Sequence, residues 1–322
     1  MLTRRNLLAA APAAALAAPA EAAQSSFETF LAGVRADARR AGISQNTINA
    51  ALGGFGPNQK VIERDRRQAE FSMTWTRYRN LVITDQKIAD GQRAVAQNRD
   101  LLRRVQDRFD VSPRVITGIW GLESSFGRIT GDYRVVEALA TLAWEGRRAK
   151  FFRSELMAAL KIIDQGNVTP ARMLGSYAGA MGQPQFMPTS YLSYAADLDG
   201  DGKRDIWTNR GDVFASIANY LARAGWRGGE TWGQQIVLPG SFESHAVGRD
   251  NRKPLQEWQR LGVRPLEGVW SGRGDQTAAV VIPSGGDGAA FMVFQNFNSI
   301  RRYNPSDFYA LAVGLLGDQL GA

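Results

Sequence analysis

Apolar residues recur at intervals of three and four along most of the chain, the spacing that places side chains on one face of a helix. The first such stripe runs from Phe27 to Ala38, and Gly42 ends it. The same reasoning predicts further helices at residues 44–52, 92–109, 112 to about 123, 135–142, 152–163, 212–221 and 306–316. Most of the chain is therefore expected to be helical.

The pattern changes after about residue 230. Short runs rich in Val, Ile, Ala and Phe lie between Gly and Pro residues at 235–238, 278–282 and 290–294. Runs of this length and composition are typical of strands. We therefore expect an α+β fold that is mainly α, with a small β-containing lobe near the C-terminus.

The stretch 112–127 holds the main candidate for chemistry. It opens on Ser-Pro, which favours a helix start, and Glu123 follows Ile116, Ile119 and Trp120 at helical spacing. Burial on an apolar face disfavours the charged form and raises a carboxyl pKa. A carboxylic acid still protonated near pH 7 is what a general acid in glycosidic cleavage requires. Two simpler interpretations stay open: an ion pair with a buried Arg, or a helix that ends early and leaves Glu123 in water.

A conventional glycosidase uses a second carboxylate. Asp132, Glu137 and Glu145 are the nearest candidates in sequence, but Glu137 and Glu145 fall on predicted helix surfaces, where a solvated side chain is the simpler interpretation. No convincing partner for Glu123 emerges. A 2-acetamido group on the substrate could supply the nucleophile instead.

Residues 197–203, Asp-Leu-Asp-Gly-Asp-Gly-Lys, form the most specific short motif. Oxygen ligands at positions 1, 3 and 5, a Gly at 6 and a carbonyl at 7 are how an EF-hand loop binds calcium. Thr208 occupies position 12, where a bidentate Glu is usual, and Asp212 can replace it if the loop is longer. The alternative is an Asx-rich turn without metal.

Residues 176–188 are dense in Gly and other small residues, with Ser176 and Gln185 among them. Such a stretch lets backbone approach a ligand while these two side chains donate hydrogen bonds, although a tightly packed corner reads similarly. The pair Arg147-Arg148 can hold a carboxylate or be solvated. Trp75 to Arg79 combines aromatic and basic residues, so it predicts either a stacking surface or a solvated face.

The N-terminus has the features of an export signal. Arg4 and Arg5 precede a short apolar run from Leu7 to Ala20, and Ala20-Glu21-Ala22 forms a small-residue cleavage site. The two arginines also favour twin-arginine export. No later stretch is long and apolar enough to predict a membrane span, and the chain has no Cys to carry a lipid. We expect a periplasmic protein with residues 1–22 removed.

The formal net charge is +8. It becomes +7 without residues 1–22, which contain two Arg and one Glu. This balance favours an anionic partner such as a cell-wall polymer. Export and the lack of a zinc-finger or RNA-binding signature argue against nucleic acid.

Three ordered motifs carry a resemblance. Gly-Leu-Glu-Ser-Ser-Phe-Gly at 121–127, Gly-Ala-Met-Gly-Gln-Pro-Gln-Phe-Met-Pro at 179–188, and the loop at Asp197 together resemble the lytic murein transglycosylase B family, glycoside hydrolase family 103. The likeness runs from about Phe71 to Leu316. It implies a lysozyme-like catalytic core, cleavage of the MurNAc–GlcNAc bond of peptidoglycan with formation of a 1,6-anhydro end, and no catalytic cofactor.

The resemblance also assigns residues. It makes Glu123 the only catalytic carboxylate, acting first as acid and then as base. Matching substrate-binding positions are Ser176, Gln185, Tyr78, Arg147, Arg148, Tyr220, Tyr303, Asn304 and Tyr309. Matching calcium ligands are Asp197, Asp199, Asp201, Lys203 through its carbonyl, and Asp212.

The expected organisation is an export signal at 1–22, an N-terminal helical lobe at 23–104, the catalytic core with the calcium loop at 105–230, and a C-terminal β-containing segment with its closing helix at 231–322. The expected partner is the peptidoglycan glycan strand, bound by a monomer without stable membrane insertion. Two rivals remain: a muramidase of the same fold, which hydrolyses the same bond, and a non-catalytic, calcium-bound wall-binding module.

Overall fold

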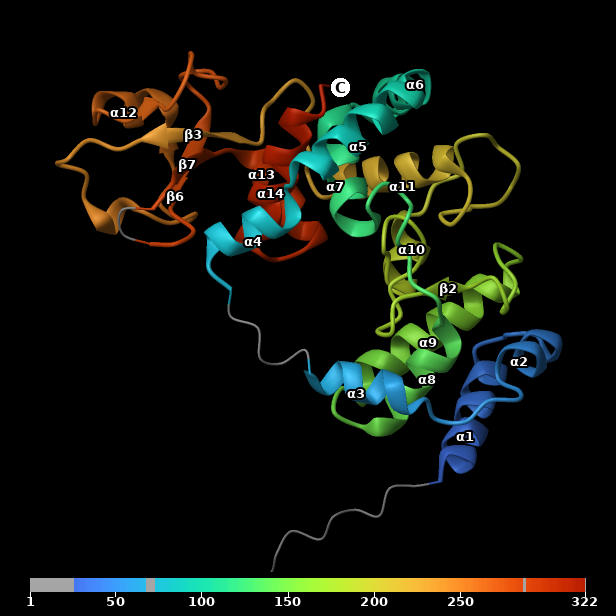
Figure 1. Ribbon diagram of the computed structural model, residues 1–322. Helices are drawn as coiled ribbons and strands as arrows, with labels where there is room; N and C mark the ends of the chain where they lie inside the picture. The colour runs from blue at the N-terminus through green and yellow to red at the C-terminus, as the bar shows by residue number, and fades with distance from the viewer. Residues whose placement is uncertain (1–25, 68–72, 286–287, 322) are drawn as a thin grey trace, which may run out of the picture.

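The structure is a computed structural model that describes residues 26–67, 73–285 and 288–321 (Figure 1). Most of these residues are helical. The helices are α1 (Phe27–Arg40), α2 (Gln45–Ala51), α3 (Gln59–Arg67), α4 (Trp75–Val82), α5 (Asp85–Gln97), α6 (Arg99–Phe109), α7 (Pro113–Ser124), α8 (Val135–Glu145), α9 (Ala149–Asp164), α10 (Pro188–Tyr194), α11 (Arg210–Arg223), η2 (Ser244–Ala246), α12 (Leu255–Arg260), α13 (Gln295–Tyr303) and α14 (Asp307–Gln319).

The strands form two antiparallel sheets. The smaller pairs β1 (Tyr133–Arg134) with β2 (Leu174–Gly175). The larger has the order β4-β6-β7-β3-β5. Its strands are β3 (Gly233–Val237), β4 (Lys253–Pro254), β5 (Arg264–Pro265), β6 (Thr277–Val281) and β7 (Ala290–Val293).

Both faces of the larger sheet are covered. Along β7, Phe291 joins the core shared with the helices, whereas its neighbour Met292 joins a separate cluster with Trp258 of α12. This alternation follows from strand geometry, in which successive side chains point to opposite faces. The small lobe at the left of Figure 1 is therefore bound to the helices through one face of its sheet.

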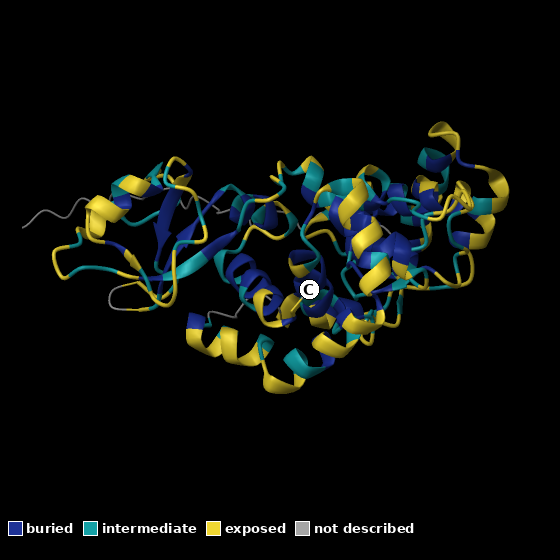
Figure 2. Ribbon diagram, turned by 90° about the horizontal axis from the view of Figure 1, so that it is seen from above, coloured by how far each residue is buried: buried dark blue, intermediate teal, exposed yellow. Residues whose placement is uncertain are grey.

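The helices divide between two further cores. One contains buried residues of α1, α2, α3, α8 and α9, at the lower right of Figure 1. The other contains residues of α4 to α7, α11, α13 and α14, and one face of the sheet. Both cores combine residues from either side of the predicted boundary at 104/105. Figure 2 shows the buried faces of these helices turned inward and the exposed faces outward.

Helices α7 and α14 approach each other closely at two glycines. A Cβ on Gly118 would lie 2.5 Å from the carbonyl oxygen of Val313, and one on Gly317 would lie 2.5 Å from that of Arg114. Since real Cβ atoms essentially never come this close to backbone, only glycine fits at either position. Two backbones in direct contact leave little room for one helix to slide along the other.

The sequence predicted the mainly helical α+β class and the positions of most elements correctly. One expectation about the helices was wrong. The single helix expected over 92–109 is broken at Asn98, which ends α5 and begins α6. In addition, helices α3, α4, α10, α12 and α13 were not predicted. The export signal lies outside the described residues.

Candidate active site

Helix α7 places Glu123 one residue before the helix ends at Ser124. The helix begins at the predicted Ser-Pro pair, although the Ser112 side chain makes no capping hydrogen bond. The next residues, Ser125, Phe126 and Gly127, all have positive φ, at 48°, 61° and 82°. Left-handed backbone costs a non-glycine residue about 1–2 kcal/mol. The strained turn therefore needs support, and the buried Phe126 ring packs edge-on against Trp120 with centroids 5.4 Å apart.

The Glu123 carboxyl meets a tyrosine from the far end of the sequence. Tyr309, in the first turn of α14, donates its hydroxyl proton to Glu123 Oε1 over 2.6 Å. Burial raises the pKa of Glu123 from 4.5 to about 7, and the hydrogen bond from Tyr309 opposes that rise. The shift corresponds to about 3 kcal/mol in favour of the neutral acid. Neither simpler interpretation holds: no described Arg pairs with Glu123, and the side chain is not in open water.

Further tyrosines surround this pair. The Tyr303 ring stacks on Tyr309, with centroids 6.5 Å apart and planes 12° apart, and Tyr220 follows at 4.7 Å from Tyr303. The negative charge of Glu123 contributes to raising the pKa values of Tyr303, Tyr309 and Tyr78, after burial. The structure thus brings together four predicted tyrosines, from helices α4, α11, α13 and α14.

The Gly-rich stretch adjoins these rings. Tyr303 donates its hydroxyl proton to the carbonyl oxygen of Pro184 over 2.6 Å. Ser176 Oγ accepts the backbone N–H groups of Ala178 and Ala180, at 3.3 and 3.0 Å. These bonds fix the Ser176 side chain against the turn, and among the hydrogen bonds of the described residues its own hydroxyl proton is not donated.

Gln185 differs from the expectation of a ligand donor. Its φ is +52°, and its amide nitrogen donates to the carbonyl oxygens of Gly182 and Thr130, at 2.7 and 3.0 Å. Both donor hydrogens are thereby engaged with backbone, and among the described residues its Oε1 accepts no hydrogen bond. The Oε1 atom of Gln185 is therefore the part of the side chain that remains able to accept a hydrogen bond.

The two arginines are held by a residue that the sequence did not single out. Arg147 and Arg148 both form ion pairs with Asp65 of α3, which is 3% exposed. Burial and the carboxylate of Asp65 raise the pKa of Tyr177, in the Gly-rich stretch. The arginines are therefore fixed rather than freely solvated. A carboxylate 82 residues upstream gives no local signal in the sequence.

Of the other carboxylates near Glu123 in sequence, Asp132 is exposed and the two on α8 have partners of their own. Glu137 accepts a hydrogen bond from the side-chain amide of Asn58 at 2.8 Å, and Glu145 pairs with Arg66 at 3.1 Å. Among the described residues, no second carboxylate interacts with Glu123.

The predicted site residue Asn304 follows the end of α13 and is exposed. Among the described residues, its hydrogen bonds are made by its backbone alone.

The loop at 197–203 brings three carboxylates together. Oxygen atoms of Asp197, Asp199 and Asp201 lie within 4.8 Å of one another. Both oxygens of Asp197 accept backbone N–H groups, from Gly200 at 2.6 Å and from Gly202 at 2.9 Å. Three converging oxygen ligands on a tight Gly-containing turn fit a hard cation such as calcium.

Asp212 does not belong to that group of three. Its Oδ1 accepts the N–H of Leu198 and its Oδ2 that of Asp205, each at 2.8 Å. The side chain is fully buried at the start of α11. In this structure it shapes the loop, and each of its oxygens keeps a second lone pair beyond the backbone hydrogen bond that it accepts.

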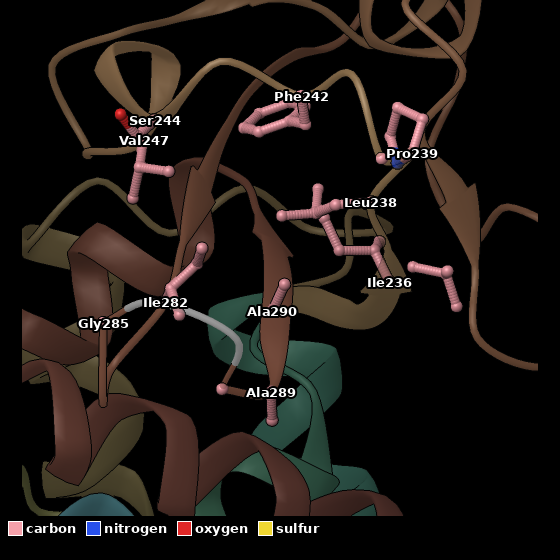
Figure 3. A pocket seen from close by; sticks show the side chains of 13 residues that line it. Ile236, Leu238, Pro239, Phe242, Ser244, Val247, Ile282, Gly285, Ala289 and Ala290 are labelled. Carbon is pink, nitrogen blue, oxygen red and sulfur yellow. The ribbon is translucent and has the colours of Figure 1, made fainter.

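A cavity of about 800 Å³ lies elsewhere, in the small lobe (Figure 3). It is lined by apolar side chains such as Leu238, Phe242 and Ile282. None of the predicted site residues lines it, so size alone does not identify the active site.

Comparison with known proteins identifies the family. Residues 26–318 match the family described as Transglycosylase SLT domain. The chain belongs to this family. It is 34% identical over 249 residues to the membrane-bound lytic murein transglycosylase B of Escherichia coli (strain K12), and the match covers 76% of this chain and 66% of that relative.

Solved structures agree with this family and with the lysozyme-like fold that the resemblance implied. SltB3 from Pseudomonas aeruginosa, in complex with NAG-anhNAM-pentapeptide, has 43% identity and a TM-score of 0.89, covering 92% of this chain and 80% of that chain. The Escherichia coli lytic transglycosylase Slt35 in complex with calcium has 29% identity and a TM-score of 0.76, covering 93% and 94%. Within the described residues, no helix combines the length and apolar character needed to cross a membrane.

Proposed function

We propose that the chain is a lytic transglycosylase that cleaves the β-1,4 bond between N-acetylmuramic acid and N-acetylglucosamine in peptidoglycan. The observation that carries the proposal is a carboxyl with a pKa of about 7, hydrogen-bonded to Tyr309 at the end of a buried helix. A group with this pKa is protonated often enough at neutral pH to give a proton, and ionised often enough to take one back.

Glu123 acts first as acid. It donates its proton to the glycosidic oxygen, and the bond from that oxygen to the anomeric carbon breaks. Because no second described carboxylate interacts with Glu123, the muramoyl 2-acetamido carbonyl stabilises the anomeric carbon. Glu123, now ionised, accepts the proton of the muramoyl 6-hydroxyl as that oxygen attacks the same carbon. The product is a 1,6-anhydro end, and Glu123 is again protonated.

The other site residues bind and orient the glycan strand. The partly exposed Tyr303 ring, stacked on the buried Tyr309, presents an aromatic surface beside Glu123, and the partly exposed Tyr78 and Tyr220 extend that surface. Ser176 donates and Gln185 accepts hydrogen bonds at the Gly-rich stretch, with Asn304 at the exposed edge. Arg147 and Arg148, held by Asp65, offer positive charge to substrate carboxylates.

Calcium has a structural role in this proposal. Asp197, Asp199, Asp201 and the carbonyl of Lys203 would hold it, and Asp212 would complete the set through a lone pair that its backbone hydrogen bonds leave free. With a charge of +2, the ion would offset most of the repulsion among the three adjacent carboxylates and would stiffen the loop that leads into α11. It supplies no catalytic chemistry.

Residues 1–22 direct the chain to the periplasm and are removed there. The basic start, apolar run and small-residue cleavage site support this assignment. Expression of the full chain in a Gram-negative host tests it: the periplasmic protein should begin after Ala22, and substitution of Arg4 and Arg5 by Lys should block export only if the twin-arginine route is used.

The deciding experiment incubates the chain, without residues 1–22, with purified cell-wall sacculi and weighs the released muropeptides. A 1,6-anhydro end is lighter by one water than a hydrolysed end, so a muramidase would give the heavier product. Glu123→Gln should reduce the rate at least about 100-fold while binding to sacculi persists. Cleavage that survives this substitution excludes Glu123 as the acid, and binding without cleavage by the unmodified chain indicates a wall-binding module.

A further inference from the structure

Helix α5 contacts the end of α7, and the turn that follows Glu123, at three points. The Lys87 ammonium donates a hydrogen bond to the carbonyl oxygen of Gly121, two residues before Glu123, over 3.2 Å. Gly91 lies against the Phe126 ring, and Asp90 forms an ion pair with Arg128 at 2.5 Å. These three α5 residues are not among the predicted site residues, and none of them takes part in the proposed chemistry.

The Lys87 contact lies where a helix has unsatisfied acceptors. Carbonyl groups in the last turn carry partial negative charge, and a cation near them is stabilising. Gly121 already receives the N–H of Ser125 at 3.1 Å, so the ammonium is a second donor to the same oxygen. Lys87 is half-buried, and burial followed by the charge of Arg128 lowers its pKa. Burial costs the Lys87 ammonium part of its hydration, and the hydrogen bond to the Gly121 carbonyl offsets that loss.

The Phe126 contact fixes the strained turn. A Cβ on Gly91 would lie 2.6 Å from Phe126 Cζ, and a Cβ on Gly121 would lie 2.7 Å from the same ring. The ring is therefore held between the backbones of α5 and α7. Since Phe126 itself has a φ of 61°, close packing of α5 and α7 around the Cε1–Cζ edge of its ring helps to keep the backbone in this strained conformation.

Asp90 extends the same contact to the end of the turn. It is 9% exposed and binds Arg128, whose guanidinium is the main cause that lowers the pKa of Asp90. Gln86 and Arg93, on the same helix, also bind Asp90. Residues on one face of α5 thus contact the chain both before Glu123, at residue 121, and after it, at residues 126 and 128.

We propose that Lys87 is a positioning residue for Glu123: by binding the Gly121 carbonyl it holds the last turn of α7 so that the Glu123 carboxyl meets both Tyr309 and the glycosidic oxygen. This inference rests on the proposed catalytic role of Glu123. Lys87 touches neither substrate nor reacting atoms in this scheme. Titratable groups from other elements that interact with Glu123 are Tyr78, Tyr303 and Tyr309.

The test compares Lys87→Met with Lys87→Arg in the chain without residues 1–22, and uses the exposed Lys161→Met on α9 as the matched control. A misplaced acid slows the chemical step more than it weakens binding. Lys87→Met should therefore lower kcat about tenfold and leave KM within a factor of two, and Lys87→Arg should restore most of kcat. Lys161→Met should behave as the unmodified enzyme.

A second readout follows the Glu123 carboxyl directly. Removing a cation beside the negative end of α7 destabilises the ionised form, so Lys87→Met should shift the titration of Glu123, measured by carbon-13 NMR of the carboxyl, upward by a few tenths of a pH unit. Gly91→Ala presses on Phe126 from the same helix and should also lower kcat with KM nearly unchanged.

The outcomes separate the two ideas. If Glu123→Gln stays active, the proposed function itself fails. If Glu123→Gln is inactive but folded Lys87→Met keeps the kcat and the Glu123 titration of the unmodified enzyme, only the positioning role is wrong. If Lys87→Met is too unstable to assay, Lys87→Ala takes its place in both measurements, and a kcat and a Glu123 titration equal to those of the unmodified enzyme contradict the proposal.

Discussion

Two regions of this molecule use carboxylates in opposite ways. At the end of α7 a single half-buried carboxyl, Glu123, is largely desolvated, and this burial raises its pKa to about 7. In the loop at 197–203 three carboxylates lie together near the surface, and the backbone N–H of Gly200 is the main cause that lowers the pKa of Asp197. The environment decides whether a carboxylate exchanges protons or binds a cation.

The difference lies in the backbone around each group. Glu123 accepts one hydrogen bond, from the neutral hydroxyl of Tyr309. This bond lowers the pKa of Glu123 by less than the loss of hydration raises it. Asp197 receives two backbone N–H groups and remains near water, so its ionised form is favoured.

The largest effect concerns the stability cost of keeping Glu123. Its folded pKa lies above the unfolded value, so the folded state binds the proton more tightly, and stability falls as pH rises from about 4.5 through about 7. Glu123→Gln should therefore be more stable than the unmodified chain at pH 8 by up to about 3 kcal/mol, and equal to it near pH 4. Urea unfolding at both pH values measures this. Exposed Glu267→Gln should show no such difference, and equal gains at both pH values would contradict a buried, titrating Glu123.

Shortening the acid should cost nearly as much. Glu123→Asp keeps the carboxyl but withdraws it by one methylene from Tyr309. A displacement of about 1 Å at a reacting group can cost about 100-fold in rate. We expect a kcat loss of that order with an unchanged fold by circular dichroism. A variant that retains most of its activity would show that the position of the carboxyl is not critical.

Removing calcium should have a moderate effect on stability and none on the chemical step. An ion present at 100 times its dissociation constant contributes about 2.7 kcal/mol, or roughly 5 °C in Tm for a chain of this size. A calcium chelator should lower Tm by about that amount. The double variant Asp199→Asn with Asp201→Asn should lose the response, whereas exposed Asp250→Asn should keep it. A Tm unaffected by the chelator removes calcium from the proposal.

The smallest effect concerns the hydroxyl of Tyr309. Its hydrogen bond lowers the pKa of Glu123, so Tyr309→Phe should raise that pKa and move the alkaline limb of the pH–activity profile upward by about one unit. Tyr220→Phe removes a hydroxyl that donates to the Arg302 carbonyl instead, and it should leave the limb in place. A limb that stays fixed in Tyr309→Phe would mean that another group sets it.

Local patterns in the sequence were sufficient for some of these features and not for others. Glu123 was found because helical spacing placed it on an apolar face, and the three aspartates because their spacing is that of a calcium loop. Asp65 was missed, since its arginine partners lie more than 80 residues away and α3 gives no local sign of a buried charge. The break at Asn98 was missed because no Gly or Pro marks it and an Asn side chain ends α5 by bonding back to Ala94.

The hydrogen bond between Tyr309 and Glu123 could not be predicted from local sequence patterns. The family resemblance pointed to this residue, but nothing in the sequence shows that its hydroxyl reaches Glu123 across 186 positions. That meeting depends on how α7 and α14 cross, and the crossing depends on glycines whose importance lies in the side chain that they lack.

The contact between Gly118 and the Val313 carbonyl has a consequence for evolution as well as for engineering. A single added methyl group at 118 would have to separate the two helices, and the 2.6 Å link from Tyr309 to Glu123 would lengthen with them. Two positions with no functional group of their own therefore set the tolerance of the proton-transfer geometry. Random mutagenesis for lost lytic activity should return substitutions at Gly118 and Gly317 alongside those at the acid itself.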